Sequence, residues 1–223
     1  MSQKSKKNKS NIIVIGNSKK FIRIIRSIYK DSYIKIYSWR SISNIDFQKE
    51  NKFKNPKLIL ICGYDYASQW YSFNKYYSSN ISMPIKFVKF LANYRTNILY
   101  IDTIDKIINN KIKNNSYTFS RYEFAKKELS FKLKKFNKIK ILQVAPIKNK
   151  NKILIHGGFI TKTIFSILIF LGLIKTINQK KLKKEITLKL RSKKQNISKK
   201  LRPFFLQIPR PLFLDRAARY LFD

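Results

Sequence analysis

Tyr122 and Lys126 are the residues of this chain whose types and spacing best suit acid-base chemistry. On a helix, residues four apart lie on one face, so the Lys126 ammonium can stand beside the Tyr122 phenol and favour its anion. A free phenol has a pKa of about 10, and an adjacent cation eases proton transfer at neutral pH. The pair therefore suits chemistry at a carbonyl or hydroxyl group. The competing interpretation is a chance spacing on a solvated helix face, since Tyr and Lys are common here.

Cys62 and His156 are the single cysteine and the single histidine of the chain. One cysteine cannot form an intramolecular disulfide, and neither residue is accompanied by the ligands that a metal site needs. Cys62 follows a short apolar run, where a cysteine is usually a small core side chain. The acidic residues are few and scattered. We therefore predict no metal site and no pair of catalytic carboxylates, and a reducing, cytoplasmic compartment.

Short apolar runs alternate with amphipathic stretches over the first two thirds of the chain. Because parallel strands need helical crossovers, this pattern predicts an α/β fold: a doubly wound, Rossmann-like parallel sheet. Ligands of such sheets bind at the carboxyl ends of the strands, where Gly16, Gly63, Thr103 and Pro146 fall. The predicted strands are residues 11–16, 33–38, 58–63, 98–101 and 139–144, and the predicted helices are residues 21–29, a helix opened by Pro84, and residues 119–136.

We expect the chain to divide into a basic tail (residues 1–10), a Rossmann-like sheet domain (11–150) and a small C-terminal region (151–223). The apolar run at residues 163–174 is shorter than the roughly 20 residues of a membrane-spanning helix. Lysines follow it, so two interpretations stay open: a peripheral helix on anionic lipid at the inner membrane face, or a core helix followed by a solvated basic face. The apolar run at residues 12–15 is too short for a signal peptide.

The formal charge of +38, from 49 basic against 11 acidic residues, favours phosphates, nucleic acid or anionic lipid as partners. Most of the basic residues are lysines, and Ile and Asn are also abundant, as an AT-rich coding sequence would produce. Much of the charge is then spread over the whole surface. Proteins that recognise nucleic-acid sequence favour Arg, because its planar guanidinium can donate two hydrogen bonds to one base. Arg is scarce in this chain. Nucleic-acid binding, motivated by the Tyr and Phe interleaved with Lys at residues 71–77, is therefore the weaker alternative.

The order of these features resembles the short-chain dehydrogenase/reductase superfamily, especially its extended branch of NAD-dependent epimerases and dehydratases acting on nucleotide sugars. The likeness spans about residues 12–148. Residues 13–16 look like the first strand and first glycine of the dinucleotide loop, and residues 58–63 like the strand that ends beside the adenosine. Residues 97–103 are similar to the strand that delivers a catalytic Ser or Thr. Tyr122 and Lys126 match the Tyr-x-x-x-Lys pair, and residues 139–146 look like the strand and turn facing the nicotinamide.

The resemblance implies that Tyr122 is the general acid-base, that Lys126 lowers its pKa and holds the nicotinamide ribose, and that Thr103 hydrogen-bonds the reacting oxygen. It implies NAD or NADP as cofactor and a nucleotide-linked sugar as substrate. It also implies that the sheet domain binds a dinucleotide and that the C-terminal region binds a substrate or partner. Arg40, rather than an acidic residue, follows the second strand, which favours the 2′-phosphate of NADP. The cofactor-binding residues that the resemblance implies are Gly16, Asn17, Ser18, Lys19, Arg40, Gly63 and Pro146.

The dinucleotide loop departs from the family pattern. The pattern has three glycines for the tight turn, the approach to pyrophosphate and helix packing, and here Gly16 alone is kept. Lys19 or Lys20 would bind pyrophosphate by charge. The lost glycines motivate an alternative function: a catalytically degenerate scaffold that binds a partner or an anionic membrane. A homodimer is compatible with either function.

Overall fold

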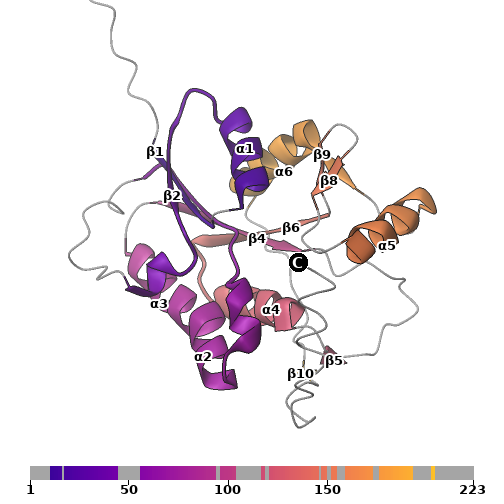
Figure 1. Ribbon diagram of the computed structural model, residues 1–223. Coiled ribbons are helices and arrows are strands. Elements are labelled where there is room, and N and C mark those ends of the chain that lie inside the picture. The colour runs from indigo at the N-terminus through magenta and orange to yellow at the C-terminus, as the bar shows by residue number, and fades with distance from the viewer. Residues whose placement is uncertain are drawn as a thin grey trace, which may run out of the picture.

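The computed structural model describes residues 11–16, 18–44, 56–93, 96–103, 117–118, 121–145, 147–149, 152–154, 159–172, 176–192 and 202–203 of the 223-residue chain. Five parallel strands form its central sheet in the order β2-β1-β3-β4-β6 (Figure 1). The strands are β1 (Asn11–Ile15), β2 (Tyr33–Tyr37), β3 (Leu58–Ile61), β4 (Asn97–Thr103) and β6 (Ile139–Val144). The predicted Rossmann-like α/β fold is confirmed.

The strand order identifies one position on the sheet where a ligand is expected. β1 pairs with β2 on one side and with β3 on the other, so the direction of winding reverses between β1 and β3. In doubly wound sheets, ligands bind at the carboxyl ends of the strands beside such a reversal. Gly16 and Gly63 both lie there, directly after β1 and close after β3.

Both faces of the sheet are buried around β1 and β3, which explains why these central strands are nearly continuous apolar runs. Successive side chains of β1 alternate between the faces: Ile13 and Ile15 join one core, and Ile12 and Val14 join the other. The helices α3 (Met83–Leu91) and α4 (Arg121–Leu133) cover the first face, and α1 (Lys19–Ile28) and α6 (Gln179–Arg191) cover the second, as Figure 1 shows.

The helix predicted to open at Pro84 is α3, which has Pro84 in its first turn, and other helical turns lead into it. A run of helical turns starts with α2 (Phe73–Tyr77), widens into a π-helical segment, η4 (Ser78–Ser82), and continues as α3. Pro84 has no N–H, and its ring clashes with the carbonyl four residues earlier in a regular α-helix. The wide segment just before Pro84 avoids that conflict, so the proline marks the point where the wide turns end and the regular turns of α3 begin.

Outside the central sheet, the described residues form a small sheet, a separate strand pair and two further helices, α5 (Phe159–Phe170) and α6, in the C-terminal part of the chain. The small sheet contains β7 (Ile147–Asn149), β8 (Lys152–Leu154) and β9 (Ile177–Asn178), and the strand pair joins β5 (Tyr117–Thr118) to β10 (Arg202–Pro203). The predicted apolar helix is α5 (Phe159–Phe170). Leu182 and Ile186 of α6 are fully buried in the core beside α1, so this helix completes a layer of the central fold. Within the described residues, every helix falls short of the length and apolar character that a membrane crossing requires.

Candidate functional site

Tyr122 lies in an aromatic cluster beyond the carboxyl end of β3. Its ring packs edge-on against Tyr64, with centroids 5.0 Å apart, and stacks on Tyr66 at 6.0 Å. Tyr64 follows Gly63 directly, at the end of the strand where the sheet's winding reverses. Aromatic pairs at these separations are mutually attractive. The packing therefore holds the first turn of α4 against the strand-end rim.

Lys126 is a buried amine one helical turn further along α4. Only 4% of the residue is exposed. Its Nζ donates a hydrogen bond of 2.8 Å to the carbonyl of Ile101 and lies 4.4 Å from the centroid of the Tyr100 ring. Burial lowers the pKa of Lys126 to about 8, and the nearby Asp102 carboxylate partly offsets that effect. The amine is therefore mostly charged at neutral pH yet easier to deprotonate than a surface lysine.

The Tyr122 hydroxyl has no hydrogen-bond partner among the described residues. Burial raises the pKa of Tyr122 far above its ordinary value, and electrostatic interactions with Tyr66 and with the Asp102 carboxylate act in the same direction. The phenol therefore keeps its proton at neutral pH and can donate a hydrogen bond. The lowering of this pKa by Lys126, which the family resemblance implies, stays a prediction.

A buried ion pair lies behind Lys126. Lys127 Nζ is 3.3 Å from Asp102 Oδ2, and the two side chains are 1% and 0% exposed. The Tyr100 hydroxyl donates to the carbonyl of Lys126 at 3.2 Å, which ties α4 to β4 beside the pair. Sequence reasoning missed this pair, although Asp102 stands out as an acid within an apolar strand and could have been singled out.

Gly16 and Cys62 allow β1 and β3 to approach closely at their carboxyl ends. Gly16 has φ +131°, a conformation that favours glycine, and a Cβ there would lie 3.0 Å from Cys62 Sγ. The thiol donates to the carbonyl of Ile15 at 3.3 Å. Burial raises the pKa of Cys62 to about 12, which the Lys126 charge partly offsets. Cys62 is thus a protonated packing residue and an unsuitable nucleophile.

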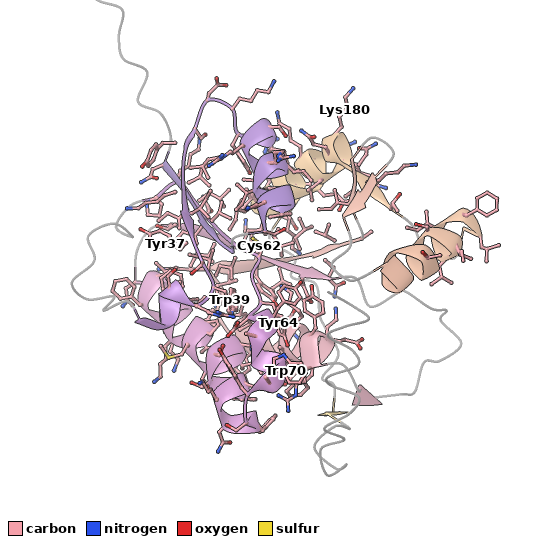
Figure 2. The ribbon with its side chains drawn as sticks, in the orientation of Figure 1. Tyr37, Trp39, Cys62, Tyr64, Trp70 and Lys180 are labelled. Atoms are coloured by element: carbon pink, nitrogen blue, oxygen red, sulfur yellow. The ribbon has the colours of Figure 1, made fainter. Side chains whose placement is uncertain are left out.

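Trp39, a residue that sequence reasoning left without a role, covers Gly63. The indole is 5% exposed, and its N–H donates to the carbonyl of Ser79 at 3.2 Å. Figure 2 shows Trp39 between the central sheet and the helices on its first face. A Cβ on Gly63 would lie 2.2 Å from the indole, far inside van der Waals contact. The glycine predicted to bind a cofactor is therefore required here by the packing of the indole.

We expect Gly63→Ala to reduce the free energy of unfolding by about 1–3 kcal/mol, because the new methyl group must displace the Trp39 indole from a filled core. Urea denaturation followed by tryptophan fluorescence measures this loss. The matched control repeats Gly63→Ala in a Trp39→Leu background, where the steric conflict is relieved and the substitution should cost much less. Equal costs in the two backgrounds would contradict the packing argument.

Arg40 is held at the same rim by an acid. Its Nε donates to Asp65 Oδ1 at 2.8 Å, and the Arg40 side chain is 62% exposed whereas that of Asp65 is 3% exposed. Ser79 Oγ also donates to Asp65, at 3.2 Å. The guanidinium is anchored by the carboxylate and still reaches solvent. Recognition of a 2′-phosphate by Arg40 stays a prediction.

The remaining predicted site residues are only partly described. Lys19 is exposed at the first position of α1, and the carbonyl of Ser18 accepts the Ile22 N–H. Thr103 ends β4, but its side chain lies outside the described residues, as do Asn17, Pro146 and His156. No group of three metal-ligating side chains occurs in the part of the chain that the structure describes.

Comparison with known proteins supports the fold. No family model and no curated protein matches the sequence. Among solved structures, the chain is similar to a UDP-N-acetylglucosamine 4-epimerase from Methanobrevibacter ruminantium in complex with UDP-N-acetylmuramic acid, with a TM-score of 0.56 and 13% identity over 85% of this chain and 75% of that one. It also aligns with a UDP-rhamnose synthase from Acanthamoeba polyphaga mimivirus, with a TM-score of 0.43 and 11% identity over 94% and 98% of the two chains. At these identities the first likeness shows a shared Rossmann-type architecture.

Proposed function

We propose that this protein is an NAD(P)-dependent enzyme of the epimerase, dehydratase or reductase type, acting on a nucleotide-linked sugar through Tyr122 and Lys126. One observation carries the proposal. A buried amine and a phenol without a described partner stand one helical turn apart on α4, at the carboxyl end of a doubly wound sheet. Perturbed ionisable groups at such a rim are typical of functional sites. The shared architecture with a nucleotide-sugar epimerase agrees with this choice.

The donor groups present fit a phosphorylated, hydroxyl-rich ligand such as a nicotinamide dinucleotide. Lys126 donates one described hydrogen bond, to Ile101, and an ammonium has three N–H groups to donate. Lys19 is exposed at the start of the ten-residue helix α1, where backbone N–H groups and the helix dipole favour phosphate. We propose that Gly16, Asn17, Ser18 and Lys19 hold the pyrophosphate. Arg40, Gly63 and Pro146 would complete the cofactor site.

The proposed chemistry divides between the cofactor and the protein. A bound nicotinamide would supply hydride transfer. Tyr122 would give its Oη proton to the reacting oxygen of the sugar, or take one from it. Lys126 would hold ribose hydroxyls and stabilise the tyrosinate by its charge, and Thr103 would donate a hydrogen bond to the same oxygen.

We expect Lys126→Met to abolish dinucleotide binding while raising the free energy of unfolding by about 1–3 kcal/mol at pH 7. The variant removes a buried amine whose charge is costly, as its lowered pKa indicates, and keeps a side chain of similar shape. Fluorescence titration with NADPH and NADH at low salt measures binding, and urea denaturation measures stability. A simultaneous gain in stability and loss of binding is the signature of a residue kept for function.

The matched control is Lys132→Met, which removes a charge of the same sign from a half-exposed position on the same helix. It should leave the binding of NADPH and NADH unchanged. That result would show that binding depends on Lys126 itself and not on a general attraction of anionic dinucleotides to a basic protein.

The stability gain of Lys126→Met should shrink as the pH rises from about 8 toward 10.5. In that range the unfolded wild type binds a proton that the folded wild type has lost, so wild-type stability increases with pH. Absence of dinucleotide binding in the wild type would refute the proposed function.

The packing of the strand-end glycines favours a second candidate, a scaffold that has kept the fold without the catalysis. The Trp39 indole fills the space beside Gly63, and the Cys62 thiol lies beside Gly16. A ligand would need that space to approach the backbone of the two glycines. In this case the wild type would bind neither NADPH nor NADH, and Lys126→Met would still raise stability. The same titration therefore decides between the two candidates.

A further inference from the structure

Among the described side chains of helix α5 and the residue that follows it, the exposed ones are uncharged and lie on one face. Thr163, Ser166, Ile167, Phe170 and Leu171 recur at spacings of three and four residues, and all of them are exposed. Residues at these spacings share one side of a helix. The stripe changes from polar to apolar along the helix, so that large apolar side chains gather at its C-terminal end.

The apolar end of α5 is open to solvent. Phe170 is 89% exposed, Leu171 60% and Ile167 52%. The N–H of Leu171 continues the helical bonding to the carbonyl of Ile167, and Gly172 then ends the helix with φ +70° and nothing within 4 Å of its Cβ position. Figure 2 shows side chains at this end of α5 pointing away from the rest of the chain. Three adjacent large apolar groups at one exposed helix end form a patch, and such patches mark interaction sites.

Charge indicates which partner fits the patch. The chain carries a formal charge of +38, and α6, the next helix along the chain, exposes Lys180, Lys181, Lys183 and Lys184. Each lysine near an anionic membrane contributes about 1 kcal/mol of attraction, and apolar side chains then enter the headgroup region. A second copy of the chain would bring two strongly positive molecules together, which charge repulsion opposes. The phosphates of a nucleic acid would pair with the lysines but would leave the apolar patch exposed to water.

We propose that the C-terminal end of α5, formed by Ile167, Phe170 and Leu171, inserts into the surface of an anionic lipid bilayer. This inference is independent of the dinucleotide site. At 12 residues α5 is about 18 Å long, too short to cross a bilayer, so it lies in the interface. Lysines hold the protein at the surface, and the apolar patch supplies the part of the affinity that salt does not remove.

The test is co-sedimentation of the full chain with vesicles of phosphatidylcholine and phosphatidylglycerol, and with vesicles of phosphatidylcholine alone. We expect binding to the anionic vesicles, and Phe170→Glu should weaken it by about tenfold or more, since a buried Phe contributes about 1.5–3 kcal/mol. Leu188→Glu is the matched control: Leu188 is 53% exposed on α6, outside the patch, and the charge change is the same. It should weaken binding less, by at most about fivefold, since one charge near the membrane is worth about 1 kcal/mol.

A second variant reports insertion directly. Phe170→Trp should add a blue-shifted component to the tryptophan emission on anionic vesicles, whereas Leu188→Trp should not. Equal losses for Phe170→Glu and Leu188→Glu would show a purely electrostatic contact and overturn the proposal. A dimer without lipid that Phe170→Glu dissociates, measured by light scattering, would also overturn it, since the patch would then bind a second copy.

Discussion

Tyr122→Phe is expected to lower turnover of a nucleotide-linked sugar by about 10²–10⁴-fold while changing the free energy of unfolding by less than about 1 kcal/mol. The Tyr122 hydroxyl has no described hydrogen-bond partner, so its removal leaves no described group unsatisfied. The phenyl ring would keep its contacts with Tyr64 and Tyr66. Loss of the proton donor would remove the general acid-base contribution to the rate. Chromatography of UDP-sugars incubated with the protein and NAD(P) measures the turnover.

The matched control for this substitution is Tyr76→Phe. Tyr76 is fully buried in the same aromatic cluster, and its hydroxyl donates to the carbonyl of Arg121 at 2.5 Å. We expect this variant to lose about 1–2 kcal/mol of stability and to keep its turnover under conditions where it is folded. If Tyr122→Phe turned over UDP-sugars at the wild-type rate, Tyr122 would have no role in proton transfer. A stability loss as large as that of Tyr76→Phe would instead indicate a structural hydroxyl.

Asp102→Asn should reduce the free energy of unfolding by about 3–5 kcal/mol, because it leaves the Lys127 ammonium buried without its carboxylate. Neither side chain of the pair is more than 1% exposed, so water cannot replace the lost partner. The measurement is urea denaturation at pH 7. Loss of the Asp102 charge should also make the neighbouring Lys126 harder to protonate, since that carboxylate raises the pKa of Lys126.

Two further variants test whether the cost comes from a buried charge that has lost its carboxylate. Asp102→Asn combined with Lys127→Met removes both charges, and we expect it to recover most of the lost stability. Lys132→Gln breaks the pair between Lys132 and Glu128, 3.5 Å apart at a half-exposed position on α4, and should cost less than about 1 kcal/mol. A double variant as unstable as Asp102→Asn alone would contradict this account.

Local patterns were sufficient to predict the elements of the sheet domain. Isoleucine-rich runs such as residues 58–61 have both faces buried and read as buried parallel strands, and the prediction for residues 139–144 coincides with β6. The helix predicted to open at Pro84 is confirmed as α3, but the helical turns that precede it, α2 and η4, were not predicted. Proline at a first turn is a common signal for a helix start. The helical turns before it carry Tyr76 and Ile81, which pack in the aromatic cluster, and the local sequence pattern does not contain that packing.

The sequence by itself determined the alternation of strands and helices, the doubly wound class, and the placement of Tyr122 and Lys126 on one helix flank. These properties depend on hydrophobic periodicity and on spacings of a few residues. The tertiary structure decided that the indole of Trp39 covers Gly63, that Asp102 pairs with Lys127, and that burial rather than charge dominates the pKa of Tyr122. Each of these depends on the distances between groups about 25 to 60 residues apart and on how far each group is exposed to solvent. Folding of the chain sets both quantities, and local sequence patterns do not contain them.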